Sequence, residues 1–439
     1  MSGPKVVRVV TREELVAAGT LALARLDAAV SQWKLGCGDV KLADLEATKE
    51  RRDELAAMLA ADRFAEFGQA AAKEIDFLEA DAARRRERAA QVRAQERLRQ
   101  SSGQELARTL LRAGADLNQQ VRAELEQAAT GLLSVGEMDA ALSRARQALF
   151  QVPAQGASAE QKILAQRLGG SETDTSFEAW RAKASKPDVR LQSVFTHLAE
   201  LEALGFADAG ELEAQLRAVQ AIENESTRDM RLDTLVLALR KTKDGALAKM
   251  KLLRQVEGLN AELSAIASES ETLAKLRSAT LRMDLEHLQV LVALGREELA
   301  KTQAAFAAAA RRNAVLGGLQ KLGYQVQEGL ATVTPDSGRL VVRSPSRSDY
   351  GVEVVTGANH KLQVRSVAFD ATRDASQDIA EERRWCGDFG KLQATLQASG
   401  CEVVLEKALG VGAVPLRVVE VVAEHRRRQA SSGETGRSR

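Results

Sequence analysis

The chain has 439 residues, of which 28% are charged and only 3% are aromatic. Its 62 basic and 61 acidic residues give a net charge of +1, which excludes binding to nucleic acid or an anionic membrane through a whole-molecule field. Any such binding must be local. Few aromatic residues beside many charged ones are typical of helices that pack through Ala and Leu, so we expect an extended, largely helical molecule.

The cysteines and the hydropathy pattern indicate in which cellular compartment the protein is expected. Cys37, Cys386 and Cys401 form no CxxC pair and no even disulfide framework, which fits a reducing environment. The first residues lack the apolar segment of a signal peptide, and no run approaches the roughly eighteen apolar residues of a spanning helix. We therefore expect a cytoplasmic protein without a membrane partner. The richness in Ala and Arg suggests a bacterial source.

The chain begins with a short strand and a capped helix. Lys5–Val10 reads KVVRVV, a β-branched run too short to stand alone, and it indicates an edge strand or an ordered arm. Thr11 and Glu14 have the spacing of a capping box, in which the hydroxyl and the carboxylate each bind a backbone amide at a helix start. This pattern predicts a helix over about residues 12–34.

A second, longer helix is predicted next. Together with the strand and the first helix, it forms a predicted N-terminal region of residues 1–100. Asp39 can cap its start. Its apolar stripe thins after Leu78, so its second half is expected to be solvated, and Ser101–Gly103 is expected to break it. Residues 101–225 then predict a bundle of short helices. They include a hairpin of two helices at 191–204 and 209–222.

Residues 226–322 predict a long helical hairpin. No proline occurs between Pro187 and Pro335, as long uninterrupted helices require. One helix is expected from 227 to about 282 and the last from 285 to 322. The apolar positions begin on a heptad and then slip, so antiparallel helices folded back within one chain are favoured over a supercoiled rod. Self-association through the helices remains open.

The residue pattern changes near Tyr324, and residues 323–424 predict a small α+β head. Val352 and Val354 alternate with Glu353, which is typical of an antiparallel sheet with one buried face. The polar, basic tail at 425–439 is expected to be disordered. Strands are predicted at 324–330, 339–343, 350–356, 362–369, 401–405 and 416–422, and a helix at 375–398. The predicted fold class is mainly α, with long antiparallel helices or a coiled coil and a C-terminal α+β domain of an antiparallel sheet plus one or two helices.

Two basic segments could contact phosphates, with the strong salt dependence that counterion release gives. Interleaved acidic residues and the absence of stacking aromatic residues favour ordinary solvated helix faces instead. If the two helices pair, their basic segments could form one patch. The first segment contains Arg84, Arg85, Arg86, Arg88, Arg93 and Arg97, and the second contains Arg240, Lys241, Lys243, Lys249, Lys251 and Arg254.

The head contains the remaining candidates for chemistry. A Cys/His nucleophilic pair could combine His360 with Cys386 or Cys401, and a carboxylate set for a cation could be built in the same domain. Nothing predicts a third orienting group for the thiol, and acids in the first turn of a helix also stabilise its positive end. The candidate residues of the head are Glu353, His360, Asp374, Asp378, Trp385 and Cys386.

Catalytic motifs are absent from the sequence. It contains no GxxxxGK[ST], GxSxG or HExxH, and no complete GxGxxG. We therefore expect no enzymatic activity, no catalytic residue, no cofactor and no resident metal. The leading hypothesis is a scaffold or accessory protein of a bacterial multi-protein assembly, with other proteins as partners and the head as the recognition module. The alternative is a nucleic-acid-associated protein of genome maintenance or phage defence that uses the arginine-rich helix. A hydrolase in the head is the least favoured hypothesis.

Overall fold

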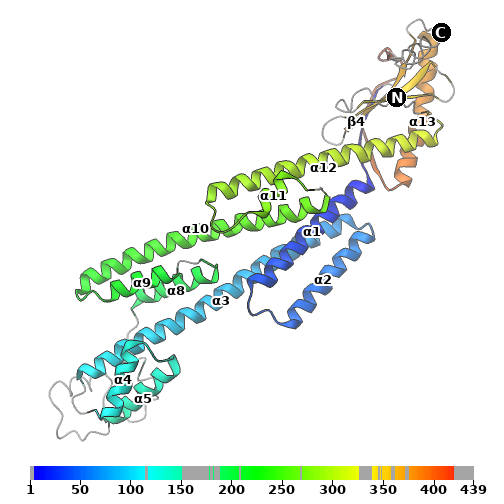
Figure 1. Cartoon of the computed structure of the whole chain (residues 1–439). Helices are drawn as coiled ribbons and strands as arrows, with labels where there is room; N and C mark the ends of the chain where they lie inside the picture. Colours follow the sequence, from blue (N-terminus) through cyan, green and yellow to red (C-terminus); the bar gives the residue numbers. More distant parts are fainter. Residues whose placement is uncertain are drawn as a thin grey trace, which may run out of the picture.

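The computed structural model describes residues 4–113, 117–150, 177, 181, 188–206, 209–266, 269–325, 339–344, 347, 349–356, 361–370 and 375–419. A helical shaft carries a small α+β head at one end and a bundle of short helices at the other (Figure 1). The predicted fold class, mainly α with a small C-terminal α+β domain, is confirmed. Most of the predicted strand at 324–330 and the tail at 425–439 lie outside the described residues.

The first helix, α1 (Arg12–Gly36), begins where the sequence predicts. Thr11 is its N-cap, and the Thr11 hydroxyl accepts a hydrogen bond of 3.2 Å from the backbone amide of Glu14. Such a bond satisfies one of the amides that a helix start leaves without a partner. Leu26 and Trp33 are buried where α1 packs on the neighbouring helices. Local sequence chemistry therefore fixes this helix start.

The second predicted helix is in fact two helices, α2 (Leu42–Ala60) and α3 (Phe64–Ala113). Lys41, and not Asp39, is the N-cap of α2. The chain turns between the two helices at Asp62, whose φ of 59° lies in the left-handed region. Aspartate visits this region more readily than most residues because its short side chain can bond locally. The expectation of one continuous helix is therefore wrong.

The predicted break at Ser101–Gly103 is also wrong, because α3 continues through it and the boundary at residue 100 falls inside a helix. A Cβ on Gly103 would lie 2.4 Å from Cε of Met138, which belongs to α5 (Val135–Phe150). The glycine thus permits close packing and does not end the helix. The end of α3, α4 (Gln119–Thr130) and α5 share a small core that includes Leu106, Leu110, Leu125 and Leu142.

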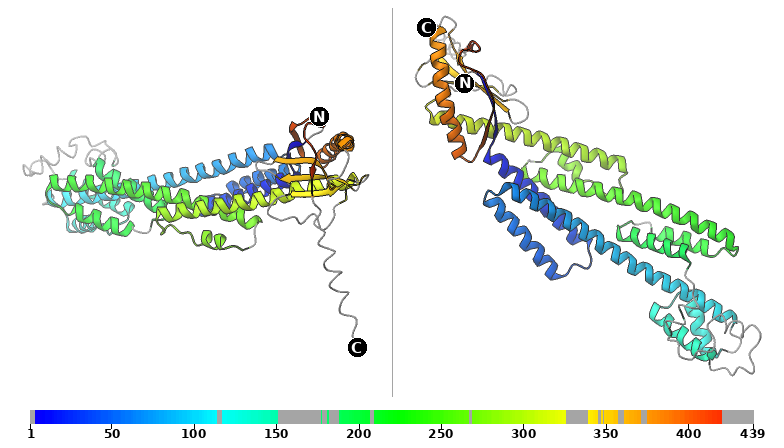
Figure 2. Two further views of the ribbon diagram at one scale, coloured as in Figure 1. Left: turned by 90° about the horizontal axis from the view of Figure 1, so that it is seen from above. Right: turned by 180° about the vertical axis from the view of Figure 1, so that it is seen from behind.

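The rest of the shaft returns towards the head. The predicted hairpin is confirmed as α8 (Val189–Ala203) and α9 (Ala209–Gln220). The helix predicted to reach residue 282 ends earlier, as α10 (Glu225–Ile266), and a short α11 (Glu271–Arg277) with its own cap at Ser270 follows. The last shaft helix, α12 (Leu285–Lys321), runs back along α10 to the head, as both views of Figure 2 show.

The N-terminal strand, β1 (Lys5–Val10), is an internal strand of the head sheet and not an edge strand. It pairs antiparallel with two strands of the C-terminal region. The strands that the structure describes in that region are β2 (Arg339–Arg343), β3 (Tyr350–Thr356), β4 (Lys361–Ala368), β5 (Glu402–Ala408) and β6 (Arg417–Val418). Their order is β2-β3-β4-β1-β5, with β6 parallel to the end of β4. The head therefore needs both ends of the chain.

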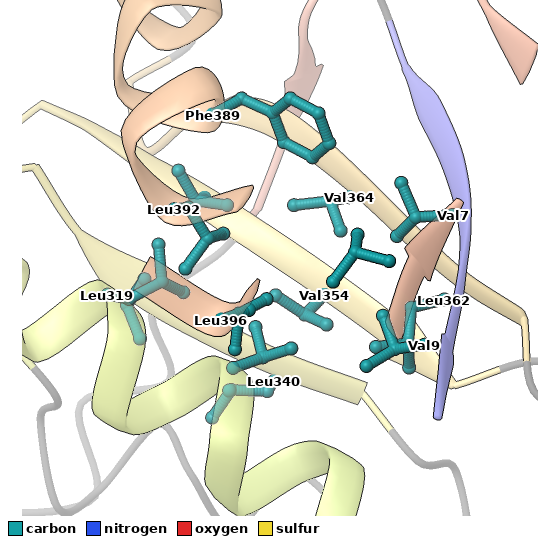
Figure 3. Packing of buried hydrophobic residues seen from close by; sticks show 14 of the residues in the cluster. Val7, Val9, Leu319, Leu340, Val354, Leu362, Val364, Phe389, Leu392 and Leu396 are labelled. Carbon is teal, nitrogen blue, oxygen red and sulfur yellow. The ribbon is translucent and has the colours of Figure 1, made fainter. Parts of the chain in front are cut away.

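One face of the sheet is covered by α13 (Ala375–Ala398) and by the end of α12. Val7 and Val9 of β1 point towards Phe389, Leu392 and Leu396 of α13 (Figure 3). Leu319 of α12 belongs to the same core and lies at the left of the cluster in Figure 3. The predicted helix at 375–398 and the strands at 339–343 and 350–356 are confirmed.

Candidate functional site

Glu353 lies in the middle of β3, on the sheet face that α13 does not cover. Its side chain is fully buried, with 0% exposed. The Arg365 guanidinium, directly opposite on β4, donates a hydrogen bond to the Glu353 carboxylate, and an Arg417 nitrogen on β6 lies 3.8 Å from its other oxygen. Two arginines therefore compensate this buried charge.

The acidic start of α13 lies on the opposite side of the sheet from Glu353. The Tyr350 hydroxyl donates to the Asp378 carboxylate at 3.0 Å, and the Ser344 hydroxyl donates to Glu381 at 3.2 Å. The Gly412 amide donates to Glu382 at 2.6 Å. These bonds hold α13 to the strands and to the loop before β6, so the sheet separates Glu353 from the acidic residues of the helix.

No group of three or more His, Cys, Asp and Glu side chains placed to hold a metal ion occurs among the residues that the structure describes. His360 and Asp374, two of the predicted site residues, lie outside the described residues. Cys401 is buried, and burial raises the pKa of its thiol. A raised pKa leaves less of the nucleophilic thiolate at neutral pH.

Lys5 is the site residue that the sequence did not reveal. Its side chain is only 3% exposed, and its ammonium lies 3.6 Å from the Cys386 sulfur and 4.8 Å from the centre of the Phe389 ring. Burial lowers the pKa of Lys5, although Cys386 and Glu382 act in the opposite direction. Its position in register with Val7 and Val9 was the available signal, since alternate residues of a strand share a face.

Trp385 stands beside this lysine in the head core. Its ring is 1% exposed, and its centre lies 5.7 Å from the Lys5 ammonium. The Tyr324 ring packs edge-on against it at 6.1 Å, and the Tyr324 hydroxyl donates to Asp388 at 3.0 Å. The structure thus places Trp385 and Cys386 beside the buried ammonium of Lys5. The aromatic contacts around it are typical of a packed core.

The six arginines singled out on α3 differ in their surroundings. Arg85 binds Asp81 at 2.6 Å and Asp44 at 3.0 Å, and Arg97 binds Glu202 of α8 and Glu213 of α9. These two therefore join α3 to its neighbours. Arg86 is half-buried. The remaining three, Arg84, Arg88 and Arg93, are exposed.

The second basic segment, on α10, likewise contains both residues that lie close to acidic side chains of other helices and residues that are exposed. Lys243 binds Glu200 of α8 at 2.8 Å, and Arg254 lies 3.9 Å from Glu79 of α3. Because α1 and α8 each pack on both α3 and α10, the two basic helices are joined mainly through them. Arg240, Lys241 and Lys251 are exposed.

The last candidate surface is the free side of β5. This strand pairs with β1 on one side, and no described strand pairs with it on the other. Val404 is 46% exposed and Leu405 is 42% exposed. The pairing with β1 has a bulge at Val6 and Val7, just beyond these residues. We call residues Glu402–Leu405 the β5 edge.

Two further findings concern the helices and the comparison with known proteins. Of the helices that the structure describes, none combines the length and the apolarity needed to cross a membrane. Comparison with protein-family models, with curated proteins and with solved structures finds no match to this chain.

Proposed function

We propose that the protein is a non-enzymatic scaffold or accessory protein of a bacterial multi-protein assembly in the cytoplasm. The helical shaft sets the spacing, and the head recognises a partner protein. Two described head residues that the sequence offered for catalysis support this proposal, because each binds another residue of the head and thereby stabilises the fold. Glu353 binds Arg365, and Asp378 binds Tyr350.

The β5 edge is the observation that carries the proposal. An edge strand offers unpaired backbone donors and acceptors, and proteins usually protect such edges with charges, prolines or bulges. Here the bulge and the charged Glu406 and Lys407 lie in the second half of β5, and Glu402 at its start is the one charged residue of the first half. The first half keeps a regular register with β1 and exposes Val404 and Leu405. A partner strand can add to this half, as in β-augmentation.

The surroundings of the β5 edge indicate what the partner strand carries. Arg8 is the cross-strand neighbour of Val404, and its side chain is exposed. Lys361 on β4 is in turn the neighbour of Arg8, and its ammonium pairs with Glu406 of β5 at 2.7 Å. An extended segment with apolar residues facing Val404 and Leu405, and a basic residue opposite the exposed Glu402, complements this surface in shape and charge.

The connection between the head and the shaft also supports a scaffold. β1 is continuous with the start of α1 and lies inside the head sheet, while α12 contributes Val315 and Leu319 to the head core. The head is thus attached to the shaft by two separate parts of the chain. Two attachments hold a domain in a more defined orientation than a single linker does.

A purification experiment with matched variants tests the proposal. The full chain is purified with its partners from the bacterium that encodes it, as the native protein and as Val404→Lys. The control is Leu237→Lys on α10, where the native leucine is 68% exposed. We expect a partner that the native protein and the control both retain and that Val404→Lys loses. Hydrogen exchange of the complex should then show protection at residues 402–405.

Two results would contradict the proposal. The first is an identical set of retained proteins for all three chains. The second is hydrolysis of nucleotide, nucleic acid or peptide that is lost in Glu353→Gln or Cys386→Ser in protein that remains folded. The nucleic-acid alternative stays a second candidate, because Arg84 and Arg88 lie one helical turn apart and are exposed.

A further inference from the structure

The shaft contains a cavity of about 390 Å³ where the end of α1, the middle of α3, α10 and the connection from α11 to α12 meet. Small-molecule sites typically have volumes of this order. Its apolar wall includes Trp33, Leu78 and Leu253. Trp33 and Leu78 belong to the core shared by α1 and α3, and Leu253 belongs to the core of α10 and α12. The cavity therefore lies between two hydrophobic cores.

Charged side chains line the same cavity. Arg86 and Glu79 come from α3, and Arg254 and Glu257 come from α10. Arg254 lies 3.9 Å from Glu79. The Arg86 Nε donates a 3.1 Å hydrogen bond to the carbonyl of Ala82 in its own helix. No carboxylate in the described part of the chain forms an ion pair with Arg86.

Burial disfavours two of the charges that line the cavity, those of Arg86 and Glu257. Burial lowers the pKa of Arg86, and the positive charge of Arg254 lowers it further. Burial also raises the pKa of Glu257, against the opposing effect of Arg254. Glu79 already lies 3.9 Å from Arg254, so Arg86 is the guanidinium that a bound anion would stabilise most, with Arg254 as a second donor. A cavity with charged groups in its lining is not expected to remain empty.

We propose that this cavity binds a small organic anion, whose carboxylate or phosphate group is held by Arg86 and Arg254 and whose apolar body contacts Trp33 and Leu253. Guanidinium groups bind both kinds of anionic group through paired hydrogen bonds. Gln32 and Thr280 also line the cavity and supply neutral polar contacts. The sequence analysis placed Arg86 among the arginines that could contact nucleic acid. In this proposal Arg86 instead binds a small organic anion inside the shaft. This site is independent of the β5 edge.

Isothermal titration calorimetry on the full chain tests the ligand class. The probes are phenyl phosphate, benzoate, inorganic phosphate and, as a cation of similar size, benzylamine. We expect phenyl phosphate or benzoate to bind with a Kd below about 1 mM, and benzylamine to give no binding heat. The tighter of the two aromatic anions distinguishes a phosphate ester from a carboxylate. Inorganic phosphate should bind at least about tenfold more weakly, because it lacks the apolar body.

Variants locate the binding. Arg86→Gln and Arg254→Gln should each weaken the binding of the aromatic anion by about tenfold or more, since each removes a charged donor. Ala82→Phe should block binding by filling the cavity while both arginines remain. Arg88→Gln, at an exposed position on the same helix, should leave the affinity unchanged. Circular dichroism and thermal melting confirm that each variant is folded.

Three results would overturn the inference. They are no binding of either aromatic anion to the folded native protein, binding that Arg86→Gln leaves unchanged, and binding of benzylamine or inorganic phosphate as tight as that of the aromatic anions. The first would mean that water alone occupies the cavity. The other two would mean that the heat arises elsewhere or without the arginine pair.

Discussion

Arg311 and Glu14 are 297 positions apart, and the Arg311 guanidinium donates two hydrogen bonds to the Glu14 carboxylate, of 2.6 Å and 3.2 Å. Their side chains are only 6% and 8% exposed. The pair joins the first turn of α1 to α12, one turn before Val315 enters the head core. It therefore fastens together the two parts of the chain that carry the head.

Removing one partner of this pair should be more harmful than removing both. Arg311→Met removes the group that donates two hydrogen bonds to the buried Glu14 carboxylate, and we expect the free energy of unfolding to fall by about 3 kcal/mol. The double variant Glu14→Leu with Arg311→Met should recover part of that loss, because both charges of the pair are then removed together. Urea unfolding measures both. Arg12→Met, whose pair with Asp62 is about half exposed, is the control and should be nearly silent. A double variant as unstable as the single one would contradict this account.

Gly351 and Gly317 should respond in opposite directions to alanine. A Cβ on Gly351 would lie 2.3 Å from the Val342 carbonyl oxygen, which belongs to the paired strand and cannot move away. We expect Gly351→Ala to lower the free energy of unfolding by more than about 2 kcal/mol. Gly317 lies inside α12 with nothing within 4 Å of the same position, so its alanine variant should gain about 0.5 kcal/mol. Thermal melting compares the two, and a stable Gly351→Ala would contradict the strand register.

Lys5 should destabilise the head at neutral pH. Its pKa in the folded protein lies below the usual 10.5 because of burial, so the unfolded chain binds the proton more tightly. The resulting penalty is complete below the folded-state pKa and disappears as the pH rises towards 10.5. Lys5→Met should therefore be more stable than the native protein at about pH 7, and the difference should shrink towards about pH 10.

Urea unfolding at several pH values measures this difference. Lys391→Met is the control, because that side chain is 68% exposed and its replacement should give no pH-dependent change. A Lys5→Met protein that is less stable at neutral pH would show that the contacts of Lys5 with Cys386 and Glu382 outweigh the cost of burial.

The sequence could predict features that depend on local neighbours but not those that depend on distant parts of the chain. The Thr11 cap and the helix at 375–398 depend on neighbours within one or two turns, so local patterns predicted them. Gly103 defeated the same reasoning, since it contacts Met138 of another helix and serves packing. The β-branched run Lys5–Val10 indicated a strand but could not identify its partner strands, which lie more than 350 residues later in the chain.

The candidate site divides in the same way. Sequence spacing could show that Glu353 lies on one face of its strand. It could not place Arg365 opposite, since that pairing is set by the register of β3 and β4. It also could not show that Arg86 and Arg254 line one cavity, because α1 and α8 determine how α3 and α10 approach each other.

Arg97 and Arg93 should differ in their effect on stability although both lie on α3. Arg97 binds Glu202 and Glu213, so Arg97→Gln removes the cation that joins α3 to α8 and α9. We expect a loss of about 1 kcal/mol in the free energy of unfolding, with screening by partial exposure taken into account. Arg93→Gln, at an exposed position, should leave it unchanged. Equal effects would contradict this division of the arginines.

Variants of the exposed arginines also test the alternative hypothesis that the protein binds nucleic acid. With a net charge of +1 and exposed Glu87 and Glu96 among them, Arg84, Arg88 and Arg93 form a weak field. We therefore expect no retardation of a short DNA duplex in gel shifts, even at about 50 mM salt, where phosphate contacts are strongest. If the duplex is retarded, the triple Gln variant at these positions must abolish the shift while Arg86→Gln preserves it. That pair of results would favour the nucleic-acid function over the scaffold, because Arg86 lines the cavity.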